Sequence, residues 1–337
     1  MICLSIESSC DETAVAVIKD KREVLANIVS TQIDIHKKYG GVVPEIASRE
    51  HISNIPFVVE EALKKANISF SDIDYIGVTY GPGLVGALLV GVAYAKALAY
   101  SLNIPIVPTN HMHGHIAANY ISYPDLKPPF LSLVVSGGHT NLVYVHDYTK
   151  FEMLARTRDD AVGEAFDKVA RVLGLPYPGG PEVSKLAKLG NPTYKLPKTK
   201  FDNYDFSFSG IKTAVINLAH KEGDNLRKAD LASSFETTVC EELVDTTIEV
   251  MKDKNLNEVV LAGGVSANSY LRELLTKKTE ENNFKVYMPE LKYCTDNAAM
   301  IGVAASYNYE AGNYFDIQDK LDLNAVANLK IESWRRK

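Results

Sequence analysis

The stretch FLSLVVSGGHTNLVYVH, residues 130–146, repeats in outline the first stretch of the chain, ICLSIESSCDETAVAVIK, residues 2–19. Each stretch reads as an apolar strand, a turn of small or polar residues, a threonine and a second apolar strand. When Thr13 is aligned with Thr140, the apolar patterns AVAV and LVYV fall in step. An internal echo about one domain apart indicates two related halves, although hairpins are common and two of them often look alike.

Strands and helices alternate between and after these two stretches. IDYIGVTY (73–80) and IPIVPTN (104–110) predict buried strands, and GPGLVGALLVGVAYAKALAYSL (81–102) predicts a turn and an apolar helix. Helical spacing also marks residues 51–66, 161–173 and 229–251, and a small-residue helix is entered at Thr295-Asp296-Asn297. The proline-rich SYPDLKPPF (122–130) marks a domain boundary. This alternation predicts an α/β protein of two domains.

Composition excludes several classes of protein. The 337 residues are 46% apolar and 23% charged, with a formal net charge of −6, which argues against a uniformly basic nucleic-acid binder. The four cysteines form no C-x-x-C pair. The N-terminus has no basic region and meets acids at Asp11 and Glu12, so a signal peptide is not expected. Residues 75–95 carry no charge, but Gly81-Pro82-Gly83 interrupts them, so we expect a buried core helix rather than a membrane span. A cytoplasmic protein with reduced thiols is expected.

Three histidines alternate in PTNHMHGHIAANY (108–120). On a helix, His111 and His115 lie on one face at the i, i+4 spacing at which two histidines can coordinate one metal ion, whereas His113 lies on a different face. Such pairs also occur as packing or surface residues, so spacing leaves both interpretations open. Asp296 is a candidate third ligand, but an N-capping role alone would explain it.

Two further patterns allow a ligand or a structural interpretation. Ser136-Gly137-Gly138 and Gly263-Gly264 follow strands, where glycines let a phosphate approach the backbone or simply form a tight turn. The segment SKLAKLGNPTYKLPKTK (184–200) places five lysines near Tyr194 and Phe201 without an acid. That composition suits RNA contacts, or a solvated lysine-rich face.

Taken in order, ten strings of this chain closely resemble the bacterial tRNA N6-adenosine threonylcarbamoyltransferase family, once described as glycoproteases. The strings cover nearly the whole chain: IESSCDET, HKKYGGVVPEIASREH, GPGLVGALLVG, NHMHGH, VVSGGHTNL, GEAFDKVAR, YPGGP, FSFSGIKTA, AGGVSAN and TDNAAMI. The resemblance implies the actin-like ATPase fold, with two ribonuclease-H-like lobes around a nucleotide cleft. We expect an N-terminal lobe over residues 1–125, with a C-terminal helix at about 296–325 packing back on it, and a C-terminal lobe over 126–295.

The resemblance also implies the reaction and its residues. The family moves a threonylcarbamoyl group from threonylcarbamoyl-AMP to N6 of the adenosine 3′ to the anticodon (position 37), in tRNAs reading codons that begin with A, and releases AMP. Metal ligands match His111, His115 and Asp296, and Asp11 and Glu12 are acid–base candidates that could equally be turn-forming residues. The residues that match the nucleotide side are Val134, Val135, Ser136, Gly137, Gly138, Asp167, Gly180 and Asn268. Some relatives carry a carboxylate where this chain has Ser184, which puts a second ribose-binding acid in doubt.

Cofactor and partners follow from the same resemblance. One divalent metal ion is expected, iron by resemblance with zinc as the alternative, since two imidazoles and a carboxylate suit both. The expected partners are tRNA, threonylcarbamoyl-AMP, a smaller paralogue of the same fold and a P-loop ATPase. The chain alone is expected to form a homodimer, and no association with a membrane is expected. An ATPase or small-molecule kinase of the same fold is the alternative function, but it needs no histidine pair. A metalloprotease is disfavoured because HMHGH lacks the glutamate of H-E-x-x-H.

Overall fold

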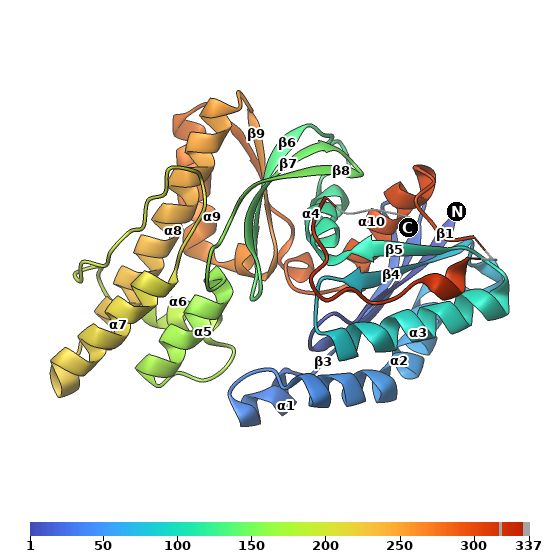
Figure 1. The fold of residues 1–337 in the computed structure, drawn as a ribbon, viewed down its shortest axis with the longest axis horizontal. Coiled ribbons are helices and arrows are strands. Elements are labelled where there is room, and N and C mark those ends of the chain that lie inside the picture. The colour runs from blue at the N-terminus through green and yellow to red at the C-terminus, as the bar shows by residue number, and fades with distance from the viewer. Residues whose placement is uncertain (317–318, 333–337) are drawn as a thin grey trace. The chain divides into compact units, whose positions relative to one another are not determined.

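The computed structural model describes residues 1–316 and 319–332, which form two compact units (Figure 1). The first unit contains Met1–Pro128, His146–Glu152 and the described part of Pro289–Lys337. The second contains Pro129–Val145 and Met153–Met288. The first unit is therefore assembled from both ends of the chain, whereas the second comes almost entirely from its middle.

The first unit is built on a five-stranded sheet of order β3-β2-β1-β4-β5. Its strands are β1 (Ile2–Glu7), β2 (Glu12–Lys19), β3 (Glu23–Thr31), β4 (Tyr75–Gly81) and β5 (Ile106–Asn110). β1, β2 and β3 are joined in antiparallel fashion, β4 runs parallel to β1, and β5 runs parallel to β4. Central strands β1 and β2 are buried almost throughout, which explains their near-continuous apolar sequence.

The second sheet repeats this order as β10-β9-β6-β7-β8. Its strands are β6 (Phe130–Val135), β7 (Thr140–Asp147), β8 (Lys150–Arg156), β9 (Glu258–Ala262) and β10 (Lys285–Tyr287). β6 pairs antiparallel with β7 and parallel with β9, as β1 does with β2 and β4. The echo between residues 2–19 and 130–146 is therefore the central hairpin of a repeated sheet.

Small residues bring helix α10 close to the first sheet. The helices of this unit are α1 (Ile33–His36), α2 (Pro44–Ala66), α3 (Val85–Leu102), α4 (His111–Ser122) and α10 (Ala298–Glu310). Residues 298–308 are all buried, and α10 packs on β1, β2 and α4. A Cβ built at Gly302 would lie 2.7 Å from Ser5 Oγ, and one at Gly114 would lie 2.6 Å from Ile301 Cδ1, so a larger residue at either position would force a neighbouring side chain to shift.

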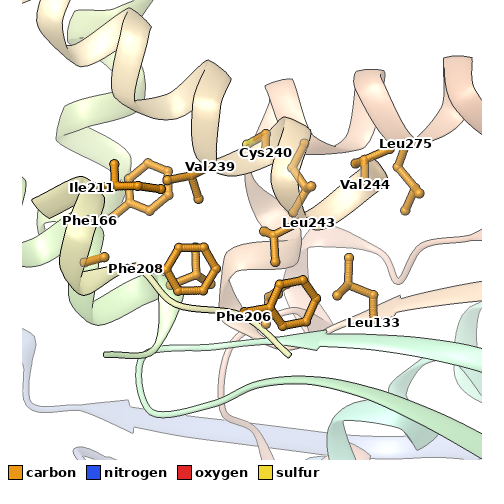
Figure 2. Close-up of a cluster of buried hydrophobic side chains, with 14 of the residues drawn as sticks. Leu133, Phe166, Phe206, Phe208, Ile211, Val239, Cys240, Leu243, Val244 and Leu275 are labelled. Atoms are coloured by element: carbon orange, nitrogen blue, oxygen red, sulfur yellow. The ribbon is translucent and has the colours of Figure 1, made fainter. Parts of the chain in front are cut away.

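Helix α8 contributes many of the side chains in the hydrophobic core of the second unit. The helices here are α5 (Val162–Leu173), α6 (Gly179–Ala187), α7 (Ser209–Glu222), α8 (Lys228–Asp253) and α9 (Ser269–Glu281). Figure 2 shows Phe206 and Phe208, from the segment before α7, with Val239 and Leu243 of α8 in one buried cluster. Short 3-10 turns connect elements at Lys37–Tyr39, Phe70–Asp72, Gly223–Asn225, Gly264–Ala267, Leu291–Tyr293 and Lys320–Asp322.

Two sequence-based expectations need correction. The sequence pattern predicted no strand between the first stretch of the chain and IDYIGVTY, but β3 lies there, so IDYIGVTY contains the fourth strand, β4. β3 was missed because it is an edge strand with mostly half-exposed residues and a weak apolar alternation. α3 is the one helix in the described part of the chain that is long and apolar enough to cross a membrane, and only a third of it is buried. It is therefore a helix with one buried face, not a fully buried one.

Candidate functional site

Helix α4 places two histidines on the same buried face. Its N-cap is Asn110, the last residue of β5, whose side chain accepts a hydrogen bond from Met112 N at 2.8 Å. The helix therefore begins at His111, and the ring centroids of His111 and His115 lie 4.6 Å apart. Both side chains are buried, with 6% and 1% exposure.

Asp296 lies directly before helix α10 and meets both rings. Asp296 Oδ1 is 3.5 Å from His111 Nε2 and 3.3 Å from His115 Nε2. The N-cap of α10 is Asn297, which accepts a hydrogen bond from Met300 N at 3.0 Å, so capping does not account for Asp296. The three candidate donor atoms lie within 4.8 Å of one another. Packing of α10 on α4 thus brings together residues that no sequence spacing could connect.

These three side chains fit a divalent cation. Both ring nitrogens of His115 are buried, and neither makes a well-directed hydrogen bond to a described residue. Burial disfavours the charged form of His111, but Asp296 and Glu7 raise its pKa to about 9. Burial and the neighbouring His111 instead lower the pKa of His115. Two Nε2 atoms and a carboxylate oxygen form an accepted donor set for zinc or iron, and a bound cation would satisfy the His115 ring.

His113 belongs to the packing of the unit. Its Nε2 lies 2.6 Å from the Ile331 carbonyl oxygen, and its ring stacks on Phe151 with centroids 3.8 Å apart. Burial lowers its pKa to about 4, so the ring is neutral at ordinary pH and Nε2 donates to that carbonyl. Its position on the helix thus directs it away from the His111–His115–Asp296 group.

The turn between β1 and β2 is fastened to helix α2. His51 of α2 places Nε2 2.9 Å from the Cys10 carbonyl oxygen and Nδ1 2.7 Å from Thr13 Oγ1. Burial lowers the pKa of His51, which favours the neutral ring that these two hydrogen bonds require. The turn that carries the acid–base candidates is therefore held by a buried side chain from another element.

The acid–base candidates lie within the electrostatic reach of Asp296. Asp11 is 7% exposed, and Glu12 accepts a hydrogen bond from Thr31 Oγ1 at 3.3 Å. Burial, together with the charges of Asp296 and Asp11, raises the pKa of Glu12 well above its ordinary value. A carboxyl group with a raised pKa holds its proton more strongly than an exposed one, which keeps Glu12 a candidate for acid–base chemistry.

In the second unit, the corresponding hairpin turn is made of serine and glycine. Val134 and Val135 end β6, and the turn is closed by Ser136 N donating to the His139 carbonyl oxygen at 2.8 Å. A Cβ added at Gly137 or Gly138 would meet nothing within 4 Å, so the turn is open on that side. A group such as a phosphate can approach such a backbone closely.

Two further sets of predicted nucleotide-side residues occupy helix ends in the same unit. Asp167 Oδ1 accepts a hydrogen bond from Gly179 N at 2.7 Å, where α6 begins one residue before Gly180. Burial raises the pKa of Asp167. Asn268 caps α9 by accepting from Leu271 N at 2.8 Å. Asn268 and Gly180 thus lie at helix N-termini, where anions are favoured, and Asp167 reaches the N-terminus of α6 from the middle of α5.

Comparison with known proteins now identifies the chain. A model of the family described as TsaD: tRNA N6-adenosine threonylcarbamoyltransferase matches residues 23–303. The protein of that name from Clostridium kluyveri is 57% identical over 335 residues, covering 97% of both chains, and that from Clostridioides difficile is 56% identical over 337 residues, covering 98% of both. The chain belongs to the tRNA N6-adenosine threonylcarbamoyltransferase family. The sequence-based family assignment is confirmed.

Solved structures support the fold of this threonylcarbamoyltransferase family member. Full-length HypF in the phosphate- and nucleotide-bound form matches with a TM-score of 0.63 and 18% identity, covering 92% of this chain and 46% of that one. Component A of the (R)-2-hydroxyglutaryl-CoA dehydratase from Acidaminococcus fermentans matches with a TM-score of 0.54 and 16% identity, covering 92% and 98%. With the two sheets of equal order, these matches confirm the actin-like ATPase-type fold.

Some lysines of the lysine-rich segment (184–200) already form ion pairs with carboxylates of the protein. Lys198 pairs with Glu241 at 2.8 Å, and Lys185 pairs with Glu182 at 2.6 Å. Among the described residues, Lys188, Lys195 and Lys200 have no ion-pair partner within 4.0 Å. The three unpaired lysines remain the stronger candidates for phosphate contacts.

The aromatic residues of this segment already have cationic neighbours. The guanidinium carbon of Arg158 lies 4.0 Å from the centroid of the Phe201 ring. The guanidinium carbon of Arg227 lies 5.8 Å from the centroid of the Tyr194 ring. One face of the Phe201 ring is therefore engaged within the protein. Base stacking on this segment gains no support from the arrangement.

Two buried glutamates beside these sites were missed in the sequence. Glu7 Oε2 lies 3.2 Å from His111 Nδ1, and Ser184 Oγ donates to Glu236 Oε1 at 2.6 Å. Glu7 is the one acid in the apolar strand ICLSIE, directly before the turn. A charged residue at the end of a buried strand is unusual and could have indicated a functional role from the sequence. Glu236 lies 52 residues from Ser184, and no spacing rule joins the two.

Proposed function

We propose that this chain transfers a threonylcarbamoyl group from threonylcarbamoyl-AMP to N6 of the adenosine at position 37 of tRNAs reading codons that begin with A. The observation that carries the proposal is the His111–His115–Asp296 group in a chain 57% identical to proteins named for this reaction. An ATPase or small-molecule kinase of the same fold has no use for that group, and the names of the relatives favour the transferase.

The reaction is an acyl transfer from a mixed anhydride. The N6 lone pair attacks the carbamoyl carbon, the bond from that carbon to the phosphate oxygen breaks, N6 loses a proton and AMP leaves. The amine is a weak nucleophile because its lone pair is delocalised into the adenine ring. Positioning therefore supplies much of the rate, and effective molarity from fixed geometry lowers such barriers by several kcal/mol, on the order of 7 or more in well-oriented cases.

His111, His115 and Asp296 would hold one divalent ion, iron in our proposal with zinc as the alternative. A bound ion of this kind orients the threonyl group and polarises a carbonyl. Asp11 and Glu12 are the acceptors we propose for the N6 proton, since their turn is fixed by His51 and lies in the field of Asp296. The target base lies in an unpaired loop, so unstacking it costs only a few kcal/mol.

The second unit would bind the adenylate. The open turn at Ser136-Gly137-Gly138 offers backbone N–H groups to the phosphate, with Val134 and Val135 leading into it. Asp167 of α5 and the helix N-termini at Gly180 and Asn268 would add further polar groups to this site. We propose that the two compact units are the two lobes of the fold. The first unit includes residues 1–125 and the helix after Asp296, and the second includes most of residues 126–295.

We propose that helices α2 and α3 dock a smaller paralogue of the same fold. Neighbouring α2 and α3 expose large apolar side chains, notably Phe57 at 71%, Ile52 at 63% and Val85 at 55%. Exposed apolar clusters of this kind mark interaction sites, and two helices offer a face for a second helix pair. Alone, the chain would use this face to form a homodimer, and a P-loop ATPase completes the cytoplasmic assembly that acts on tRNA.

Nucleoside mass spectrometry tests the reaction. Purified chain is incubated with threonylcarbamoyl-AMP and unmodified tRNA, with and without partner proteins, and threonylcarbamoyladenosine is expected to form. The matched control is the same tRNA with guanosine at position 37, which lacks the N6 amine and should remain unmodified. Turnover of ATP with no modified nucleoside under any condition would favour the kinase alternative.

A further inference from the structure

We infer that Glu7 is a positioning residue for the proposed metal site, acting through His111. Both Nε2 atoms face Asp296, so a cation held there needs the Nε2 lone pair of His111. The ring proton must then reside on Nδ1, which lies 3.2 Å from Glu7 Oε2. A carboxylate that accepts this proton fixes the tautomer and the ring orientation of a metal-binding histidine.

The surroundings of Glu7 keep it an acceptor. The side chain has no exposed surface, Oε1 accepts from Ser9 N at 2.6 Å, and Oε2 accepts from Thr79 Oγ1 at 2.5 Å. A protonated carboxyl group would instead carry an O–H donor on one oxygen and have less acceptor capacity. A buried carboxylate with two donors from the protein is suited to take a third from an imidazole N–H.

Two alternative explanations must be distinguished from a positioning role of Glu7. Ser9 Oγ lies 3.1 Å from the same His111 Nδ1, so it is the competing partner for that proton. The second is a purely structural role, in which Glu7 only fastens the Ser9 backbone and β4 through Thr79. A structural role would alter the stability of the metal-free protein, whereas a positioning role would alter the affinity for metal.

The test measures Zn²⁺ affinity of the full chain by competition with a chromophoric chelator. Glu7→Gln is expected to weaken Zn²⁺ binding by about 10–100-fold, the usual effect of removing such an outer partner. Ser9→Ala and Thr79→Val, which leave the carboxylate in place, should change it much less. Zn²⁺ affinity of Glu7→Gln within twofold of wild type, or a larger loss in Ser9→Ala, overturns the inference.

A measurement on the wild type covers the case in which Glu7→Gln does not fold. In ¹⁵N-histidine spectra of the Zn²⁺-loaded protein, the His111 ring should carry its proton on Nδ1, with the assignment made by loss of the signal in His111→Gln. A His111 ring without a proton on Nδ1 refutes the role of Glu7 as its acceptor.

A separate observation in the second unit points to Glu236, and this inference rests on the proposed function. Asn268 Nδ2 donates to both Ser184 Oγ at 2.9 Å and Glu236 Oε1 at 2.7 Å, while its Oδ1 caps α9. Ser184 Oγ also donates to Glu236 Oε1. The two amide protons of Asn268 and the hydroxyl proton of Ser184 are thus committed within the protein.

We propose that Glu236 supplies the ribose-binding carboxylate that Ser184 lacks. Glu236 is 5% exposed, and its second oxygen, Oε2, has no hydrogen-bond partner among the described residues. A carboxylate repels phosphate but accepts hydrogen bonds from ribose hydroxyls. Some relatives have a carboxylate at the position of Ser184. In this chain Glu236 of α8 places a carboxylate next to Ser184 instead.

Binding of AMP to the full chain tests Glu236. Glu236→Gln is expected to bind AMP about tenfold more weakly, while Glu241→Gln on the exposed side of α8 should not. Wild type should bind 2′-deoxy-AMP or 3′-deoxy-AMP more weakly than AMP, and Glu236→Gln should lose that discrimination. If both deoxynucleotides bind the wild type within twofold of AMP, Glu236 does not read the ribose. No AMP binding by wild type would instead contradict the proposed function itself.

Discussion

The two compact units share one sheet order but differ in what their central hairpin carries. In the first, the strand before the turn ends in Glu7, and the turn continues to Asp11 and Glu12. In the second, the same position holds Ser136, Gly137 and Gly138. One hairpin presents charged side chains and the other presents bare backbone. The two units therefore share their sheet geometry, and the functions that we propose for them differ through the residues at this one turn.

The largest effect that this comparison predicts is loss of the metal from the first unit alone. His115→Ala should reduce bound metal, measured by elemental analysis, to a small fraction of wild type and lower activity by on the order of 10³-fold, because a ligand and not an outer partner is removed. AMP binding should be unchanged. Metal content equal to wild type would contradict the assignment.

His113→Ala is the matched control for that experiment. It removes a stacked, hydrogen-bonded ring from the packing, so it should cost about 2–4 kcal/mol of stability by thermal denaturation. Metal content per folded molecule should stay near normal. This variant separates loss of packing from loss of a ligand on the same helix.

A pH dependence is also expected from His111 in the first unit. In the metal-free protein the pKa of His111 is raised from about 6.5 to about 9, so its stabilising charge is fully present below about pH 6.5 and is lost as pH rises through 9. The loss amounts to at most about 3 kcal/mol. Melting temperature in the presence of chelator should fall between pH 7 and 10 in wild type, more steeply than in His111→Gln. Equal slopes would show that the charge of His111 does not stabilise the fold.

The second hairpin should respond to steric change rather than to charge. Gly138→Val adds a side chain where nothing lies within 4 Å, so the fold should tolerate it. AMP affinity, measured by calorimetry, should fall on the order of tenfold because the phosphate can no longer approach the backbone. Metal content should not change. Unaltered AMP binding would mean that the open turn does not bind the phosphate.

The smallest effect concerns tRNA binding by the lysine-rich segment. Replacing Lys188, Lys195 and Lys200 together by alanine should lower the slope of log K against log salt by about one for each lysine–phosphate interaction that the substitutions remove. Lys198→Ala should change it less, since Lys198 is paired with Glu241. An unchanged slope in the triple variant would show that these lysines are only solvated.

The sequence predicted what depends on local pattern. Apolar strands and capped helices were placed correctly where burial is strong, as in β1, β2 and α5, which ends at Gly174 with φ 75°. The i, i+4 pair on α4 was also visible. The half-exposed edge strand β3 was missed because its pattern is weak.

Proximity between residues distant in the chain could not be predicted from spacing. Asp296 meets His111 because α10 packs on α4, where Gly114 lies against Met300 and Ile301, and Asn297 rather than Asp296 caps the helix. Family resemblance supplied Asp296, but neither pattern nor resemblance pointed to Glu7 or Glu236. Their roles follow from hydrogen-bond partners that only the three-dimensional structure reveals.

The split of the first unit between the two ends of the chain has a consequence for protein synthesis. The ribosome makes His111 and His115 early, but Asp296 and the buried helix α10 emerge only near the end of translation. The second unit, encoded in between, can collapse around its own core first. The complete His–His–Asp group therefore exists only after the chain is nearly finished, so the metal binding that we propose would follow completion of the first unit.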